Sequence, residues 1–313
     1  MPIPDAFKAL RLPAIASPMF LASGPDLVVE TCRAGLVGTF PALNQRSSEG
    51  FRDWLHQIRA RLAAHPGAAP FGVNLIVHKS NPRLEADLQI CIEEKVPLII
   101  TSLGAVADLV ARVHAYGGLV FHDVISARHA RKAAEAGVDG IIAVAAGAGG
   151  HAGTLSPFAL VPEIRAVFGG TIILGGAINT GRDIAAARML GADMAYLGTR
   201  FLATAESMAD PAHKQMIVDT SAADILYTPR ISGVHANFLR PSLVAAGLDP
   251  ENLHDAGALD MQGEAKVWKH LWSAGQGVGS VRDVPTAAAL CDRLVTEYRA
   301  ALAECAAEAA LYQ

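Results

Sequence analysis

Short, continuously apolar segments alternate along the chain with longer segments in which apolar and polar positions follow a helical period. Apolar segments of this kind, rich in β-branched residues, are typical of strands buried on both faces of a parallel sheet. Eight of them are Ala14–Ala16, Leu36–Phe40, Phe71–Ile76, Pro97–Ser102, Gly118–His122, Gly140–Val144, Thr171–Gly176 and Met194–Thr199.

The intervening segments predict helices. Residues 84–94 place apolar side chains on one stripe and acidic side chains opposite, and residues 127–136 and 181–190 each end before a glycine, which is a common helix stop. Ser156-Pro157 has the residue types that begin a helix. Eight strand–helix units favour a closed (β/α)8 TIM barrel over an open sheet.

The barrel is expected to occupy residues 1–209. Residues 210–313 form no separate low-complexity linker, and we expect a mostly helical C-terminal extension that packs on the barrel. The final segment, Thr286–Tyr312, is alanine-rich and amphipathic, so it predicts a helix that closes the fold.

Composition narrows the class of protein. The chain has 313 residues, is 51% hydrophobic and has a net charge of -4, which excludes a disordered chain and does not favour a nucleic-acid partner. No apolar run approaches the roughly 18 residues of a membrane span, and the N-terminus does not resemble a secretory signal. Four cysteines lie far apart in the sequence. We therefore expect reduced cysteines and a cytoplasmic protein.

Functional residues of a TIM barrel lie at the carboxyl ends of its strands. The candidates there include Met19, Asn74, Ser102, His122, Asp123, Gly175, Gly176, Gly198 and Thr199. The two glycine-containing strand ends predict a phosphate site, because bare backbone N–H groups beside helix N-termini bind anions. The alternative is that these glycines only permit tight turns.

The loop after the sixth strand, residues 145–154, carries His151 among small residues. This loop resembles the glycine-rich fingerprint of dinucleotide-binding proteins. We reject that interpretation because residues 154–157 separate the loop from the next helix and no acidic residue ends the following strand. Imidazole is suited to proton abstraction near neutral pH, and His151 has no bulky neighbours to bury it. We expect a catalytic base, with a structural histidine as the alternative. No histidine or cysteine spacing predicts a metal site.

The chain resembles the nitronate monooxygenase family, formerly called 2-nitropropane dioxygenases. The matching segments are Ser17–Met19, Gly72–Asn74, Gly149–Gly153, Leu174–Gly176, Gly191–Phe201, Ser232–Val234 with Asn237, and Trp272–Gln276. This resemblance implies an FMN-dependent barrel enzyme. It implies that Met19, through its backbone, and Asn74 hold the flavin, that Gly175, Gly176, Gly198 and Thr199 bind its phosphate, that Gly150 and His151 face its reactive side, and that Gln276 approaches it.

Two positions depart from the family pattern. The acidic residue common four places before the histidine is Gly147 here, and a lysine of one quinone-reductase branch corresponds to Asp123. Ser102, His122 and Asp123 are the candidate substrate residues.

Three functions remain open. The first is oxidation of an alkyl nitronate or nitroalkane by FMN and O2 to a carbonyl compound and nitrite. The second is NAD(P)H-dependent reduction of a quinone or an enoyl thioester. The third is a flavin-free barrel that binds a phosphorylated ligand or acts as a lyase.

Overall fold

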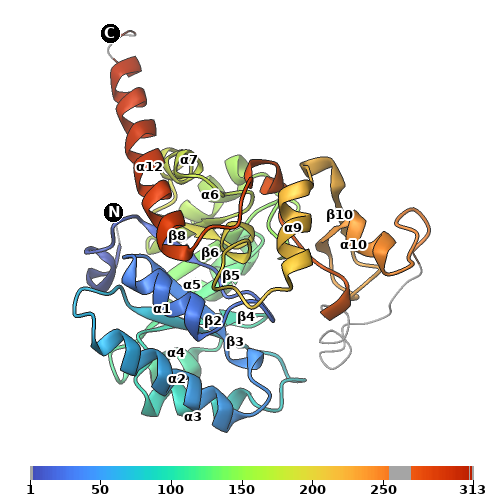
Figure 1. Ribbon diagram of the computed structural model, residues 1–313. Coiled ribbons are helices and arrows are strands. Elements are labelled where there is room, and N and C mark those ends of the chain that lie inside the picture. The colour runs from blue at the N-terminus through green and yellow to red at the C-terminus, as the bar shows by residue number, and fades with distance from the viewer. Residues whose placement is uncertain (1–2, 254–268, 310, 312–313) are drawn as a thin grey trace.

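The structure is a computed structural model that describes residues 3–253, 269–309 and 311. Eight parallel strands form a closed barrel in the order β1-β2-β3-β4-β5-β6-β8-β9, and β9 pairs with β1 to close it (Figure 1). The barrel strands are β1 (Ala14–Ala16), β2 (Val37–Pro41), β3 (Phe71–Ile76), β4 (Leu98–Ser102), β5 (Leu119–Val124), β6 (Gly140–Val144), β8 (Thr171–Gly175) and β9 (Met194–Leu197). All eight predicted strands and the predicted TIM barrel are confirmed, with small differences at the strand ends.

The barrel interior is a packed core. Ile15, Ile100, Ile142 and Ile173 belong to one buried cluster that draws on facing strands. Phe7, in the 3-10 segment η1 (Asp5–Phe7) before β1, joins this cluster and packs edge to face on a β5 ring at a centroid distance of 5.8 Å. Because these strands are buried on both faces, a second apolar cluster fills the space between the strands and the surrounding helices.

Helices follow the strands and surround the barrel (Figure 1). They are α1 (Pro25–Arg33), α2 (Ser48–Ala63), α3 (Leu84–Glu93), α4 (Ala107–His114), α5 (Ala127–Glu135), α6 (Pro157–Arg165), α7 (Gly181–Met189) and the short α8 (Thr199–Leu202), with the 3-10 segment η2 (Ala42–Asn44) between β2 and α2. Ser47, Ser126, Ser156 and Thr180 each cap the helix that follows by accepting a backbone N–H. The predicted helices are confirmed, and local capping explains where several of them begin.

The C-terminal part contains strands that the sequence analysis did not predict. β10 (Ile225–Thr228) and β11 (Ala236–Leu239) are antiparallel, and β11 also pairs with β7 (Gly150–His151), the two-residue strand after β6. The other elements of this part are α9 (Pro211–Asp219), η3 (Ala222–Asp224), α10 (Arg240–Ala245), η4 (Gln276–Ser280) and α12 (Ala287–Ala309). The extension is therefore of mixed composition, and the three-stranded sheet ties it to the loop that carries His151.

The last helix, α12, lies against α7 and continues beyond the body of the barrel (Figure 1). Its Glu297 carboxylate accepts the backbone N–H of Gly181 at 2.7 Å, at the first residue of α7. Leu290 and Leu294 of α12 are fully buried. The boundary between the barrel and the C-terminal extension at residue 209 stays a prediction.

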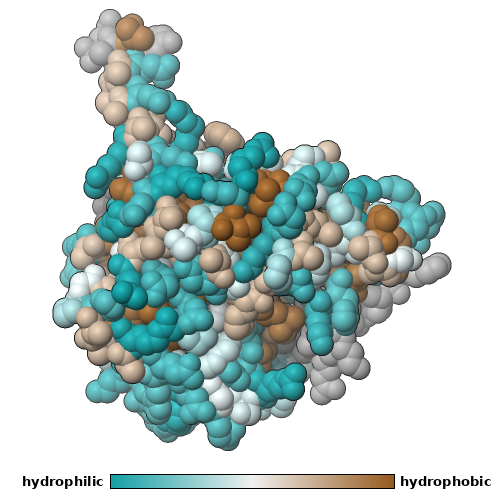
Figure 2. All heavy atoms as spheres, in the orientation of Figure 1, coloured by the Kyte–Doolittle hydropathy of each residue, from teal (hydrophilic) through white to brown (hydrophobic). Residues whose placement is uncertain are grey.

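The exterior is mainly hydrophilic on the face shown in Figure 2, where the hydrophobic groups are small and scattered, one of them beside α9. Among the described residues, no helix is both long enough and apolar enough to cross a membrane. All four cysteines are free thiols, and only Cys305 is exposed.

Candidate active site

A cavity of about 1800 Å³ lies at the carboxyl ends of the barrel strands, a size above the roughly 300–1,000 Å³ of most ligand pockets. Loops from both the barrel and the extension line it. The predicted site residues along its wall are Met19, Asn74, Ser102, His122, Asp123, Gly150, His151, Gly175, Gly176, Gly198 and Thr199. Gln276 is exposed and does not line the cavity, although its neighbours Gly275 and Gly277 do.

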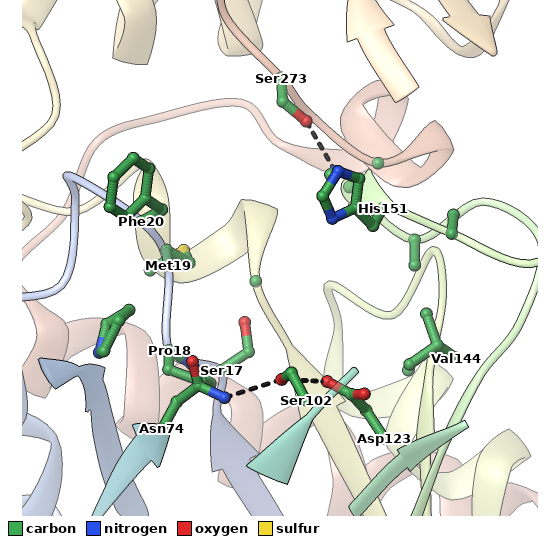
Figure 3. A pocket seen from close by; sticks show the side chains of 18 of the residues that line it. Ser17, Pro18, Met19, Phe20, Asn74, Ser102, Asp123, Val144, His151 and Ser273 are labelled. Atoms are coloured by element: carbon green, nitrogen blue, oxygen red, sulfur yellow. Dashed lines mark hydrogen bonds between the residues drawn. The ribbon is translucent and has the colours of Figure 1, made fainter. Parts of the chain in front are cut away.

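Three side chains at the ends of β3, β4 and β5 form a hydrogen-bonded chain on the cavity floor (Figure 3). Asn74 Nδ2 donates to Ser102 Oγ at 2.8 Å, and Ser102 Oγ donates to Asp123 Oδ2 at 2.5 Å. Burial raises the pKa of Asp123 to about 6, against the lowering effects of the Ser102 hydrogen bond and the charge of His151. The floor therefore holds a carboxyl group that can take up or release a proton close to neutral pH.

His122 lies one residue earlier on β5 and has a different character. Its Nδ1 is 2.8 Å from Thr101 Oγ1, and burial lowers the pKa of His122 to about 4. The imidazole is therefore neutral at physiological pH, so its ring provides a polar contact in the cavity wall and no positive charge for an anion.

His151 extends into the cavity from the β6–α6 loop. Figure 3 shows its ring across the cavity from Phe20 and above the floor residues Ser102 and Asp123. Its backbone pairs with Ala236 of β11. The small-residue loop thus places His151, which is half-buried, in the cavity wall, and the strand that anchors it is supplied by the extension.

Ser273 and Asn237, also from the extension, fix this loop further. Ser273 Oγ accepts the Gly150 N–H at 2.7 Å and donates to the Asn237 carbonyl at 2.6 Å, while Asn237 Nδ2 donates to the Ala148 carbonyl at 2.6 Å. Sequence reasoning matched both residues to a family pattern but gave them no role. No local signal marks them, because their partners lie far away in the chain.

The loops after β8 and β9 carry the glycines that the sequence predicts to bind a phosphate; we call these loops the glycine cradle. Gly176 has φ +136°, and a Cβ there would lie 3.0 Å from the Ala146 carbonyl oxygen, so both conformation and space favour glycine. Gly198 directly precedes α8, and Thr199 Oγ1 accepts the Gly275 N–H at 2.8 Å. The Thr199 hydroxyl therefore already joins the extension to the cradle.

A buried amide beside the cradle supports an anionic ligand. Asn179, after β8, is 4% exposed and lines the cavity, and its Nδ2 has no hydrogen-bond partner among the described residues. A buried unpaired donor is costly unless a ligand satisfies it. The glycine loops and this amide fit an anionic group such as a phosphate. Sequence reasoning missed Asn179, whose only signal was its place between a cradle glycine and the α7 cap.

Met19 lines the cavity after β1, and Asn44 supports it from η2. The Met19 N–H donates to Ser23 Oγ at 2.9 Å, and the Met19 carbonyl accepts from Asn44 Nδ2 at 3.0 Å. The Met19 backbone is thus already hydrogen-bonded within the protein, and the residue lines the cavity. Among the described residues, no cluster of side chains could hold a metal ion.

The closed barrel, with its cavity at the carboxyl ends of the strands, is the architecture of a TIM-barrel enzyme. Comparison with known families is more specific, since the nitronate monooxygenase model matches residues 5–297. The chain therefore belongs to this family of flavin-dependent oxidoreductases.

Two curated relatives show the range of the family. The chain is 27% identical to a nitronate monooxygenase of Paraburkholderia phytofirmans, over 88% of this chain and 89% of that protein. It is 29% identical, over 74% of this chain, to "(3aS,4S,5R,7aS)-5-hydroxy-7a-methyl-1-oxo-octahydro-1H-indene-4-carboxyl-CoA dehydrogenase" of Mycobacterium tuberculosis. The matched region spans 64% of that dehydrogenase's own length.

Solved structures agree in fold. FabK from Thermotoga maritima superposes with a TM-score of 0.80 at 25% identity, covering 96% of this chain and 97% of that one. A nitroalkane oxidase from Streptomyces ansochromogenes superposes with a TM-score of 0.82 at 24% identity, covering 95% and 98%.

Proposed function

We propose that this protein uses FMN and O2 to oxidise alkyl nitronates, or the parent nitroalkanes, to a carbonyl compound and nitrite. One observation carries the proposal. A single cavity brings the glycine cradle and the buried Asn179 amide together with His151. Family membership supports the flavin chemistry of that cavity.

The residues divide into those that would hold the cofactor and those that act on the substrate. Gly176, Gly198 and Asn179 would hold the phosphate, and Asn74 lies on the floor near the place expected for the ring. We propose FMN over FAD because the sequence has no second pyrophosphate fingerprint for an adenosine half. Bound flavin supplies the oxidation of the substrate.

His151 is the group proposed to handle the substrate. A neutral nitroalkane must lose a proton from carbon, and an imidazole that lines the cavity can accept it. A preformed nitronate arrives without that proton, so His151 would only bind or orient the anion. The two roles predict different behaviour towards the two substrates.

The variant His151→Asn separates these roles. If His151 is the base, the variant should keep FMN but lose about 10²–10⁴-fold in kcat/KM on a neutral nitroalkane, and much less on the corresponding nitronate. His129→Asn, an exposed histidine of α5 at the rim, is the matched control and should change neither. Equal losses on both substrates would assign His151 to anion binding, and no loss on either would remove it from the mechanism.

The cofactor is tested directly by its spectrum and mass. The purified protein should show a flavin spectrum, and mass spectrometry of the released cofactor should show FMN. Finding FAD would contradict the proposal. A colourless protein that FMN cannot reconstitute would instead support the flavin-free reading.

A second candidate is NAD(P)H-dependent reduction of a quinone or an enoyl thioester. The size of the cavity favours it, because about 1800 Å³ exceeds the need of FMN and a small nitronate, and one relative's name describes a CoA-ester dehydrogenase. Anaerobic mixing discriminates the two: rapid bleaching of the flavin by NADH or NADPH selects the reductase, and bleaching by a nitronate alone selects the oxidase.

A further inference from the structure

The lining of the cavity includes several large apolar side chains that are exposed, beside exposed charged residues such as Arg46 and Lys132. Five large apolar side chains line it although each is between 37% and 47% exposed. These residues, the apolar collar, are Phe20, Leu21, Leu103, Ile125 and Met208. They come from the loops after β1, β4 and β5 and from the segment before α9, so segments distant in sequence converge on one opening. Exposed apolar side chains gathered in this way mark a binding surface.

Two collar residues are held in a strained backbone conformation. Leu21 has φ +58° and Leu103 has φ +66°, in the left-handed region that costs roughly 1–2 kcal/mol for a residue with a Cβ. Such strain persists only where the surrounding structure imposes it, and it clusters at functional sites. The strained conformations of Leu21 and Leu103 therefore indicate a functional role for these two exposed leucines.

Polar side chains at or beside the cavity hydrogen-bond to the backbones of Leu21 and Leu103 and help to hold their left-handed conformation. Asn44 Oδ1 accepts the Leu21 N–H at 2.9 Å, and Asn44 Nδ2 donates to the Ser23 carbonyl at 2.8 Å. The backbone of Leu103 hydrogen-bonds to Asp123, the carboxyl group of the cavity floor. The collar is thus coupled to the polar floor beneath it, and both leucines are fixed at the opening.

The cavity therefore has two chemically different regions. Its floor is polar, with the Asn74, Ser102 and Asp123 chain and His151 above it. The apolar collar forms a second, apolar region among the exposed lining residues. Its volume of about 1800 Å³ leaves room beyond a cofactor. A ligand that matches both regions carries a small polar reacting group and a bulky apolar body.

We propose that the apolar collar selects substrates with a long alkyl chain, and that Leu21 and Leu103 are specificity-determining residues. This inference rests on the proposed function only for the identity of the reacting group. Each methylene buried against the collar should raise kcat/KM by up to about fourfold.

The test compares primary alkyl nitronates from propyl to octyl on the FMN-loaded enzyme. We expect kcat/KM to rise steeply with chain length. Leu103→Asn replaces the apolar side chain with one that tolerates the left-handed conformation, and it should reduce the octyl-to-propyl ratio of kcat/KM at least about tenfold. Val106→Asn is the matched control: it lies in the same β4–α4 loop, is 44% exposed and does not line this cavity. A flat chain-length series, or equal ratios in the two variants, would overturn the proposal.

A binding measurement keeps this test separate from the proposed reaction. Octanoate and propionate differ only in their apolar part, and calorimetric titration of the flavin-loaded protein should show much tighter binding of octanoate, a preference that Leu103→Asn reduces and Val106→Asn retains. If no nitronate is turned over but this preference holds, the proposed reaction is wrong and the collar stands. Equal affinities would refute the collar even in an active nitronate oxidase.

Discussion

Replacing the floor carboxyl group should make the protein's stability depend differently on pH. The pKa of Asp123 is about 6 in the folded protein, compared with its ordinary value of 3.8, because burial disfavours the charged carboxylate. The folded state therefore binds this proton more tightly than the unfolded state. Well below pH 3.8 the carboxyl group is protonated in both states, and it does not reduce stability. As the pH rises from 3.8 through about 6, the unfolded state ionises first and the folded state loses stability; above about 6 this loss is complete.

The magnitude follows from the two values. Their difference is 6 − 3.8 = 2.2 pH units, and at about 1.36 kcal/mol per unit the ionised carboxylate costs about 3 kcal/mol above neutral pH. Asp123→Asn cannot ionise, and its amide oxygen can still accept the Ser102 hydroxyl. Part of this loss has already occurred at pH 4, so we expect the free energy of unfolding of this variant to gain about 2.5 kcal/mol on the wild type between about pH 4 and about pH 7.5.

Urea denaturation of the flavin-free proteins at the two pH values measures this difference, with the flavin state matched between them. Asp53→Asn, an exposed carboxyl group of α2, is the control and should give the same difference from wild type at both pH values. A difference between Asp123→Asn and wild type that does not change with pH would refute the argument that burial raises this pKa.

Three further predictions concern backbone geometry and support. Gly176→Asp should give a folded protein without flavin, because a carboxylate beside the phosphate repels it; full flavin content by absorbance would place the phosphate elsewhere. Gly38→Ala should destabilise the protein by about 1–3 kcal/mol, since a Cβ there would lie 2.6 Å from a backbone oxygen of α1, whereas Gly169→Ala has no atom within 4 Å and should be nearly neutral; equal melting temperatures of the two variants would contradict this. Ser273→Ala should lower activity more than stability, because its hydroxyl holds the strand of His151; unchanged kinetics would show that the loop is rigid without it.

Local sequence determined the barrel. A parallel strand is buried on both faces, so Phe71–Ile76 or Gly140–Val144 is recognisable by its continuous apolar residues alone. The carboxyl ends of such strands must meet at one end of a barrel, and the order of the chain therefore predicted that Asn74, Ser102 and Asp123 would lie together. Their hydrogen-bonded chain is the local consequence of that order.

Only the tertiary structure decided how the remainder is assembled. β10 and β11 are short antiparallel strands without a continuous apolar run. β11 pairs with β7 through residues that are 236 − 151 = 85 and 237 − 150 = 87 positions apart, so no local pattern marks this pairing. Leu21 and Leu103 likewise have left-handed backbone conformations that their sequence does not predict. Hydrogen bonds from Asn44 and Asp123, which are distant in the chain, help to hold these conformations. Residue type predicted where the reactive groups of this protein lie, whereas long-range hydrogen bonds decided how they are held, because those bonds join positions whose proximity exists only after folding.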